Sequence, residues 1–315
     1  MYAFFVNLLF FKLKLMSVKK NPIINEYHLN NEQQDKPQFR VHDLNEYLKE
    51  HYGDTTKPHI HSFYQIIWFK KGNGTHYVDF KGYDVVENAF FFIAKNQVHY
   101  FDNNTDYQGI LIHFNESFLV QKDSEVDFFL KYNLFNSPYQ QPSCCVNQPI
   151  FEQTLNEYIV LIKKELQNNN EFGKEELLRT YLKAILIQVQ RRKIELENNI
   201  DDTPFIVNEK RIQLIKFVNL IDENYNKGLS VSEYAQLMNI STRTLSEMIS
   251  KNLNKTPSQL IYERIILEAK RLLLHSDLNV NQIGYRLGFD DPSYFVKYFK
   301  KHTNISPLEF RKSIS

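Results

Sequence analysis

Apolar positions change their spacing along the chain, and this change separates a strand-rich part from a helical part. Between residues 38 and 115, short runs of aromatic and β-branched residues are typical of strands. Gly72 and Gly74 follow the first run and predict a hairpin turn over residues 71–74, with the next run as the partner strand. Many short strands at close spacing predict an antiparallel barrel or sandwich. The candidate strands are residues 63–69, 75–80, 84–86, 89–93, 98–101 and 107–114.

After residue 116 the apolar residues recur at helical spacing. The apolar stripe of the longest predicted helix, residues 174–197, can pack either on its own barrel or on a second subunit. We favour packing on the barrel, with dimerisation nearby. The predicted elements are an interrupted helix over 117–135, a loop over 142–149, and helices over 150–166 and 174–197. The predicted N-terminal domain therefore spans residues 38–198, with its barrel at 38–115 and its helices at 117–197.

Two other segments flank this domain. Residues 1–37 form an extension that begins apolar and becomes polar. Its apolar stretch is shorter than the ~20 residues needed to span a bilayer, and it lacks the features of a secretory signal. We expect Met16 to be the biological start, with a membrane-surface anchor as the alternative. Residues 199–207 are polar and interrupted by Pro204, which predicts a linker.

Residues 208–315 are predicted to be helical throughout, because helix-capping signals recur along them. Ser230 and Glu233 have the spacing of a capping box, and Asp291 precedes Pro292 as an N-cap. Asn254 and Asn304 stand where a left-handed residue would end a helix. The predicted helices span residues 209–225, 231–238, 242–252, 257–274, 280–287, 292–302 and 307–312.

One pattern occurs twice in this helical part, with a constant offset of 50 residues. In each copy a short amphipathic helix and a tight turn precede a second helix. This order is typical of helix-turn-helix units, whose second helix enters the major groove of DNA. The matching pairs are Leu245 and Phe295, Ile249 and Phe299, Lys251 and Lys301, Asn254 and Asn304, and Pro257 and Pro307.

The two predicted recognition helices differ in their outward chemistry. Arg243 can form two hydrogen bonds to guanine, and Ser246 and Glu247 can reach base edges. Lys297, Lys300 and Lys301 suit phosphates, which strengthen binding without specifying sequence. The predicted DNA contacts are Thr242, Arg243, Ser246, Glu247, Ser293, Tyr294, Lys297, Lys300 and Lys301.

Charge and cysteine content agree with this division. The net charge of the chain is +1, but residues 205–315 hold 16 basic and 11 acidic residues, and the remainder has a net charge of −4. A basic C-terminal part favours a nucleic-acid partner there. The only cysteines, Cys144 and Cys145, are adjacent, so we expect reduced thiols and a cytoplasmic protein.

Residues 208–315 resemble the DNA-binding domain of AraC-type transcription regulators. The resemblance lies in Ile283–Phe289, in Tyr294 with Phe295, in residues 299–301, and in Pro307, Phe310 and Arg311. It implies binding to adjacent major grooves about one helical turn (~34 Å) apart. The base-reading positions it implies are Arg243, Ser246 and Glu247 in the first helix, and Pro292, Ser293, Val296 and Lys297 in the second. Because proline offers no side-chain hydrogen bond, we expect the second helix to contribute mainly phosphate contacts.

Residues 38–115 resemble, more weakly, the cupin-like effector-binding domain of the same family. The matching features are residues 58–61, the Gly72/Gly74 turn and His99. Cupin enzymes add a carboxylate to such histidines, but no Asp or Glu lies between Asp54 and Asp79. Three imidazoles can still hold zinc, yet we expect neither a metal nor another cofactor. Alternation along residues 61–69 places the odd-numbered residues on one face and the even-numbered ones on the other. The predicted effector-binding residues are His61, Phe63, Gln65, Tyr77, His99 and His113.

The sequence thus predicts an α+β two-domain protein, a cupin-like barrel with flanking helices followed by a double helix-turn-helix domain. We expect a transcription regulator controlled by a small-molecule effector and without enzymatic activity. The expected partners are double-stranded DNA, the effector, a second copy of the chain and RNA polymerase, with no membrane. Two alternatives remain: a metal-dependent cupin enzyme fused to a DNA-binding domain, and a regulator whose barrel only dimerises.

Overall fold

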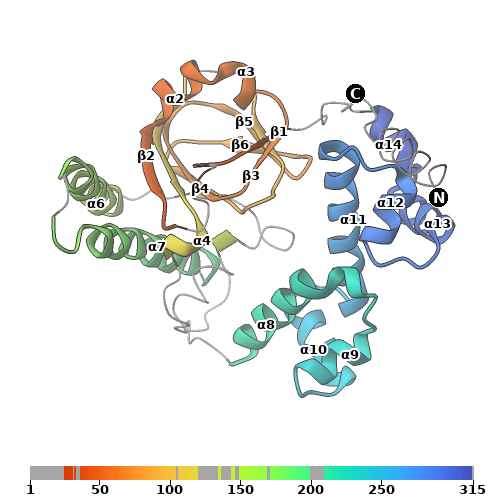
Figure 1. The fold of residues 1–315 in the computed structure, drawn as a ribbon. Coiled ribbons are helices and arrows are strands. Elements are labelled where there is room, and N and C mark those ends of the chain that lie inside the picture. Colours follow the sequence, from red (N-terminus) through yellow and green to blue (C-terminus); the bar gives the residue numbers. More distant parts are fainter. Residues whose placement is uncertain are drawn as a thin grey trace, which may run out of the picture. The chain divides into compact units, whose positions relative to one another are not determined.

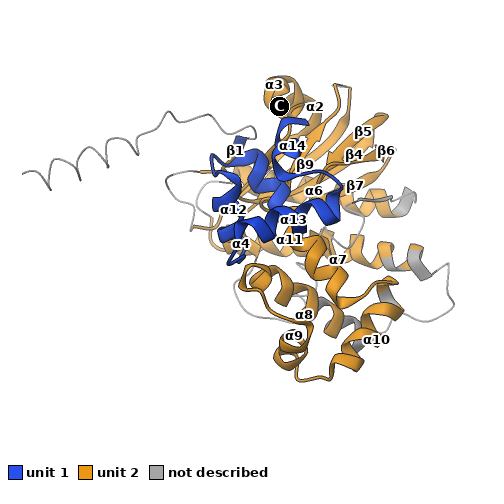
Figure 2. Cartoon of the chain, turned by 90° about the vertical axis from the view of Figure 1, so that its right-hand side faces the viewer, with its two compact units in different colours: residues 1–25, 268–315 blue, residues 26–267 orange. Residues whose placement is uncertain are grey.

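The computed structural model describes most of the chain between residues 25 and 313 (Figure 1). The described chain divides into two compact units, one containing residues 26–267 and the other residue 25 and residues 268–313 (Figure 2). The predicted start at Met16 and the linker at 199–207 lie outside the described residues. Within the described range, no helix is both long and apolar enough to cross a membrane. The residues outside the description are 1–24, 31, 33–35, 104–105, 120–133, 136–142, 146–148, 169–170, 199–208 and 314–315.

Two five-stranded sheets form the N-terminal part, and the pairs among β2 to β10 are antiparallel, as the predicted barrel or sandwich requires. In spatial order, the first sheet contains β1 (Asn25–Tyr27), β3 (His59–His61), β8 (His99–Phe101), β5 (Gly74–Val78) and β6 (Lys81–Val85). The second contains β10 (Ser143–Cys145), β7 (Ala89–Ile93), β4 (Tyr64–Lys71), β9 (Gln108–Phe114) and β2 (Phe39–Asp43). Sheets of this kind present alternate residues to opposite faces.

The predicted alternation along β4 is confirmed, and both of its faces are buried. Ile67 and Phe69 belong to the core between the sheets. Ile66 and Trp68 belong to a second core, which the sheet forms with helices α6 (Pro149–Gln167) and α7 (Lys174–Asn198). The apolar stripe of α7 therefore packs on its own barrel, as expected.

The predicted hairpin at residues 71–74 is wrong, because β4 and β5 belong to different sheets and do not pair. The tight hairpin lies one strand later, between β5 and β6, where Asp79 and Phe80 both have positive φ. Gly72 and Gly74 are needed for a different reason. A Cβ atom on either would clash with Tyr107, so the glycines allow the close approach of this buried ring.

Residues 38–115 also contain two helices that the strand pattern did not predict, α2 (Leu44–Glu50) and α3 (Tyr52–Thr55). The Asp43 carboxylate caps α2 by accepting hydrogen bonds from the backbone amides of Asn45 and Glu46. Burial of Leu44 and Leu48 then holds the helix on the sheet. The capping signal overrides the strand-like surroundings.

The loop predicted at 142–149 contains strand β10, which pairs with β7, so that prediction is wrong for residues 143–145. The interrupted helix predicted at 117–135 begins as α4 (Glu116–Leu119), and Leu134 and Phe135 are again helical. Its middle lies outside the described residues.

The seven helices predicted in the C-terminal part are confirmed, each ending within one residue of its predicted bounds. The first four are α8 (Glu209–Asn224), α9 (Val231–Leu237), α10 (Thr242–Leu253) and α11 (Pro257–His275), with a short 3₁₀ turn, η2 (Tyr225–Lys227), after α8. The last three are α12 (Val280–Arg286), α13 (Pro292–Thr303) and α14 (Pro307–Ser313).

The caps of these helices agree with the sequence signals. Ser230 and Glu233 form the predicted capping box, and Asp291 accepts a hydrogen bond from the amide of Ser293. Asn254 and Asn304 end α10 and α13 in the left-handed region, with φ of 50° and 66°. Asparagine tolerates this conformation better than other non-glycine residues, so both helices stop where predicted.

Candidate functional site

The recognition helix of the first helix-turn-helix unit is α10, and one of its faces is anchored in an apolar core. Leu245, Met248 and Ile249 are buried there, together with Phe217 of α8 and Tyr234 of α9. These are the residues expected to face inward. The opposite face of α10 is therefore held outward by packing.

The exposed face of α10 carries the side chains predicted to read bases. Thr242, Arg243, Ser246 and Glu247 are all exposed. The Arg243 guanidinium donates from Nε to Oε1 of Glu247 at 2.9 Å, and the two side chains are 89% and 54% exposed. The Ser246 hydroxyl donates to the Thr242 carbonyl at 2.8 Å. This face thus combines donors with carboxylate and hydroxyl acceptors.

The recognition helix of the second unit is α13, which is anchored by Phe295 and Phe299. Phe299 lies against Phe310 of α14, with ring centroids 5.8 Å apart. Arg311 donates from Nε to the carbonyl of Leu273 at 2.7 Å, which ties α14 to the end of α11. The exposed residues of α13 include the five that were predicted as DNA contacts: Ser293, Tyr294, Lys297, Lys300 and Lys301.

The charge on α13 comes from its lysines. Partial burial, aided by the charge of Lys301, lowers the pKa of His302 below its usual 6.5. His302 is therefore mostly neutral at pH 7 and adds little positive charge to this helix.

A cavity of about 380 Å³ opens in the N-terminal part beside the ends of β3 and β9. We call it the barrel cavity. Of the six predicted effector-binding residues, His61, Phe63 and His113 line it. His99 lies behind His61 and is fully buried. Gln65 is buried opposite His113 in the β4–β9 ladder.

The sixth predicted residue, Tyr77, does not point inward, so this prediction is wrong. On β5 the buried residues are His76 and Val78, and Tyr77 instead stacks on Tyr100 with ring centroids 4.4 Å apart. Pairing with β8 and β6 determines which face of β5 is internal. His76 takes the buried position expected of Tyr77, and alternation with Val78 was the available signal. Sequence reasoning also missed cavity-lining residues that come from other elements: Tyr27, His28, Leu29, Arg40, His42, Tyr47, His51, Asp54, Thr55 and His59.

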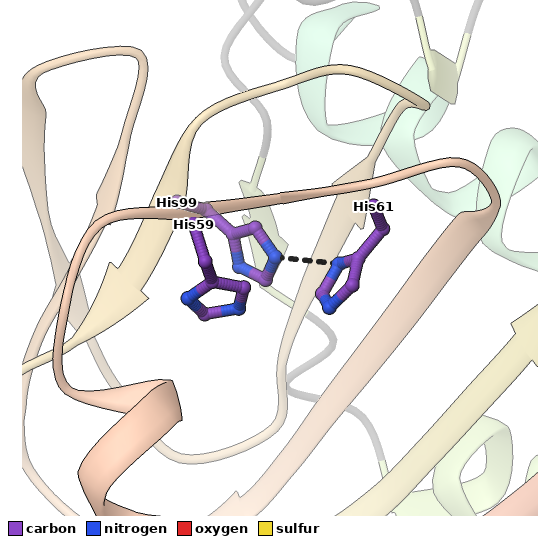
Figure 3. A group of neighbouring side chains, drawn as sticks. All are labelled: His59, His61 and His99. Atoms are coloured by element: carbon purple, nitrogen blue, oxygen red, sulfur yellow. Dashed lines mark hydrogen bonds between the residues drawn. The ribbon is translucent and has the colours of Figure 1, made fainter. Parts of the chain in front are cut away.

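Three histidines converge next to the cavity. We call His59, His61 and His99 the histidine triad (Figure 3). One ring nitrogen from each lies within 4.8 Å of the other two. Nε2 of His99 is 2.9 Å from Nδ1 of His61, and Nδ1 of His59 donates to the carbonyl of Lys57 at 2.8 Å.

Burial keeps the imidazoles of this region neutral at pH 7. Desolvation lowers the pKa of His59 to about 4 and that of His76 to about 3. For His61, His99 and His113, burial followed by repulsion from neighbouring histidines lowers the pKa well below 6.5. Neutral imidazoles offer both a hydrogen-bond donor and an acceptor, and their lone pairs can bind a metal ion.

Comparison with known proteins assigns both parts of the chain. Residues 46–180 match the model of an AraC-like ligand binding domain, and residues 234–313 match that of a helix-turn-helix domain. The chain is 23% identical over 259 residues to the HTH-type transcriptional activator RhaS of Escherichia coli O81 (strain ED1a), covering 81% of this chain and 87% of that protein. It is 28% identical over 157 residues to the lactose operon transcription activator of Staphylococcus xylosus, covering 50% and 53%.

Among solved structures, ToxT from Vibrio cholerae covers 88% of this chain and 98% of its own, with 13% identity and a TM-score of 0.43. The two domain matches follow the same order as the barrel and the double helix-turn-helix. The chain therefore belongs to the AraC-type family of DNA-binding transcription regulators.

Proposed function

We propose that this regulator reads DNA sequence mainly through α10 and holds the DNA backbone through α13, under the control of a small molecule bound in the barrel cavity. The observation that carries the proposal is the different chemistry of the two exposed helix faces. On α10, Arg243, Ser246 and Glu247 are exposed together. On α13, three lysines are exposed behind a proline at the first helical position.

The side chains of α10 suit the edges of bases. The Arg243 guanidinium can donate two hydrogen bonds to O6 and N7 of guanine, and the Glu247 carboxylate can accept from the amino group of cytosine. Their mutual ion pair is exposed and contributes only about 0.3–0.5 kcal/mol, so it exchanges readily for contacts to DNA. Because Ser246 donates to its own helix, its oxygen is left as an acceptor.

The side chains of α13 suit phosphates. Pro292 lacks a hydrogen-bonding side chain, which removes one base contact at the start of the helix. Lys297, Lys300 and Lys301 are exposed and can each neutralise a phosphate, which releases counterions and strengthens binding on any sequence. The exposed hydroxyl of Ser293 can add a backbone contact.

Selection of genomic DNA fragments bound by the full chain, followed by footprinting, tests this division of roles. We expect two protected boxes about one helical turn (~34 Å) apart, one with strong base preferences and one permissive. Equal base preferences in both boxes would contradict the proposal. Preferences confined to the box that cross-links to α13 would contradict it as well.

The effector proposal rests on the barrel cavity. Its volume of about 380 Å³ lies within the range of small-molecule sites, and it combines the ring of Phe63 with the imidazoles of His61 and His113. A thermal-shift screen of sugars and aromatic metabolites tests it, since a ligand bound only by the folded state must raise the melting temperature. At a ligand concentration of 100 Kd the gain is about 2.7 kcal/mol.

A matched variant identifies the site of a stabilising ligand. The change Phe63→Ala should abolish the shift, whereas Phe172→Ala, at an exposed position between α6 and α7, should retain it. If no ligand shifts the full chain, the alternative of a barrel that only dimerises gains support.

We further propose that the chain acts as a cytoplasmic homodimer that contacts RNA polymerase. The support for dimerisation is an exposed apolar pair on α6, where Val160 is 64% exposed and Leu161 is 40% exposed. Sedimentation equilibrium of the full chain tests it. A monomer at micromolar concentration would contradict the dimer, and wild-type transcription by a Val160→Asp monomer would show that dimerisation is dispensable.

A further inference from the structure

We propose that the histidine triad of this regulator binds a divalent metal ion of the zinc class. His59 and His61 lie two residues apart on β3 and so share one face of the strand. His99 lies directly opposite His59 on β8. The sheet therefore brings three imidazoles to one side, where all three are at most 3% exposed.

The distances suit such an ion. Tetrahedral zinc with Zn–N bonds of about 2.0–2.1 Å needs its nitrogen ligands about 3.3 Å apart. The His99 Nε2–His61 Nδ1 pair, at 2.9 Å, must open by a few tenths of an ångström. The widest pair in the triad is at most 4.8 Å apart, and rotation of the side chains can close it.

The orientation of His59 is already that of a metal ligand. A carbonyl oxygen can only accept, so the contact to Lys57 places the proton of His59 on Nδ1 and leaves the lone pair on Nε2. Metal-binding histidines commonly donate their second nitrogen to a backbone carbonyl in this way, which fixes the tautomer and the ring orientation.

His99 and His76 supply a second independent observation. Nδ1 of His99 and both ring nitrogens of His76 are buried without a hydrogen-bond partner, and the two rings lie 5.4 Å apart. Buried polar atoms without partners are rare in proteins. With Nε2 of His99 bound to a metal, the proton of its neutral ring must lie on Nδ1, and rotation of the His76 ring can bring an acceptor nitrogen towards it. The imidazole remains neutral, so the exchange releases no proton.

The donor set and the access route narrow the choice of ion. Three imidazoles favour zinc-class transition metals over calcium, magnesium or manganese, which prefer oxygen ligands. Asp54 lines the barrel cavity but does not belong to the converging group. His59 and His61 also line the cavity, so an ion on the triad can enter from it and keep a fourth coordination position open towards it.

Metal titration of the full chain after chelator treatment tests the site. Calorimetry with Zn²⁺ should give one ion per chain, and Co²⁺ should give the visible absorption of a tetrahedral site. His61→Gln and His99→Gln should each weaken binding by about 100-fold or more. The matched control is His275→Gln, at the end of α11 and outside the barrel cavity, which should change affinity less than about threefold.

Two outcomes would overturn the site: no stoichiometric ion on the wild-type chain, or equal affinity in the triad variants. A cooperative urea transition followed by the fluorescence of Trp68, which is buried in the barrel, shows whether each variant folds. The DNA selection described above needs no added metal, so failure of the metal site leaves the roles of α10 and α13 untouched.

Discussion

Replacement of Arg243 by alanine is the sharpest test of how this regulator recognises DNA. The substitution removes the one guanidinium on the exposed face of α10 and leaves the anchoring residues Leu245 and Ile249 in place. It also frees Glu247 from its ion pair. Any loss of binding should therefore come from the DNA contact.

The expected effect of Arg243→Ala on folding follows from the exposure of the Arg243–Glu247 ion pair. Loss of an exposed i,i+4 ion pair costs about 0.3–0.5 kcal/mol, and alanine is the better helix former, so folding should be nearly unchanged. Loss of a bidentate contact to guanine costs about 1–3 kcal/mol, which corresponds to a decrease in affinity of roughly 5- to 150-fold. The two effects are thus well separated.

Fluorescence anisotropy titration measures the effect on three DNAs: the selected operator, operators with single base-pair changes, and random sequence. The Arg243→Ala variant should lose affinity for the operator but not for random DNA. At one position of the operator, a base-pair change should no longer lower the affinity of this variant. Lys301→Ala should lose affinity on all three and reduce the salt slope by about 0.9. The control Lys163→Ala removes the same charge from α6 and should alter neither the affinity for DNA nor the salt slope.

Equal weakening by Arg243→Ala on operator and random DNA would refute base reading by this residue. In that case the guanidinium would act on phosphates, and the proposed difference between α10 and α13 would disappear. A variant that still discriminates against every base-pair change would exclude Arg243 as a base reader.

Two further predictions concern stability. In chelator-treated protein, lowering the pH from 7 to 5 should decrease the free energy of unfolding. His59 and His76 should each contribute about 2 kcal/mol to this decrease. Their folded pKa values of about 4 and about 3 lie below the unfolded value of ~6.5, so these two histidines take up protons in this pH range mainly in the unfolded chain. Identical urea midpoints at the two pH values would contradict this prediction. Gly74→Ala should destabilise the barrel by about 2–4 kcal/mol, because the new Cβ clashes with Tyr107. Gly53→Ala, with no atom within 4 Å of its new Cβ, should change stability by less than ~1 kcal/mol in the same assay.

The helical part was predictable nearly to the residue because its signals are local. A capping box at Ser230, a proline after Asp291 and left-handed asparagines at 254 and 304 act over one turn of chain. The 50-residue repeat then identified the two recognition helices. Their exposed faces followed from the 3.6-residue period alone.

The barrel was predictable only in part. Alternation along β4 correctly placed Phe69 and Trp68 on opposite faces; the structure shows that Phe69 faces the core between the sheets and Trp68 faces the helices. The same reasoning failed for Tyr77, because β5 offers an aromatic residue on each face and its pairing with β8 decides which one is internal. Strand partners come from distant parts of the chain, and a shift of one residue reverses every side chain.

The sequence by itself determined the family, the double helix-turn-helix and the residues that α10 and α13 expose. It could do so because apolar periodicity and capping residues are local to each helix. The cupin resemblance grouped residues 58–61 with His99, but only the tertiary structure showed that one ring nitrogen from each of His59, His61 and His99 lies within 4.8 Å of the others. Only the tertiary structure decided that the turn at Gly72 and Gly74 connects two sheets. The physical reason is that sheet partners and buried clusters depend on packing between segments far apart in the chain. No local pattern specifies such packing.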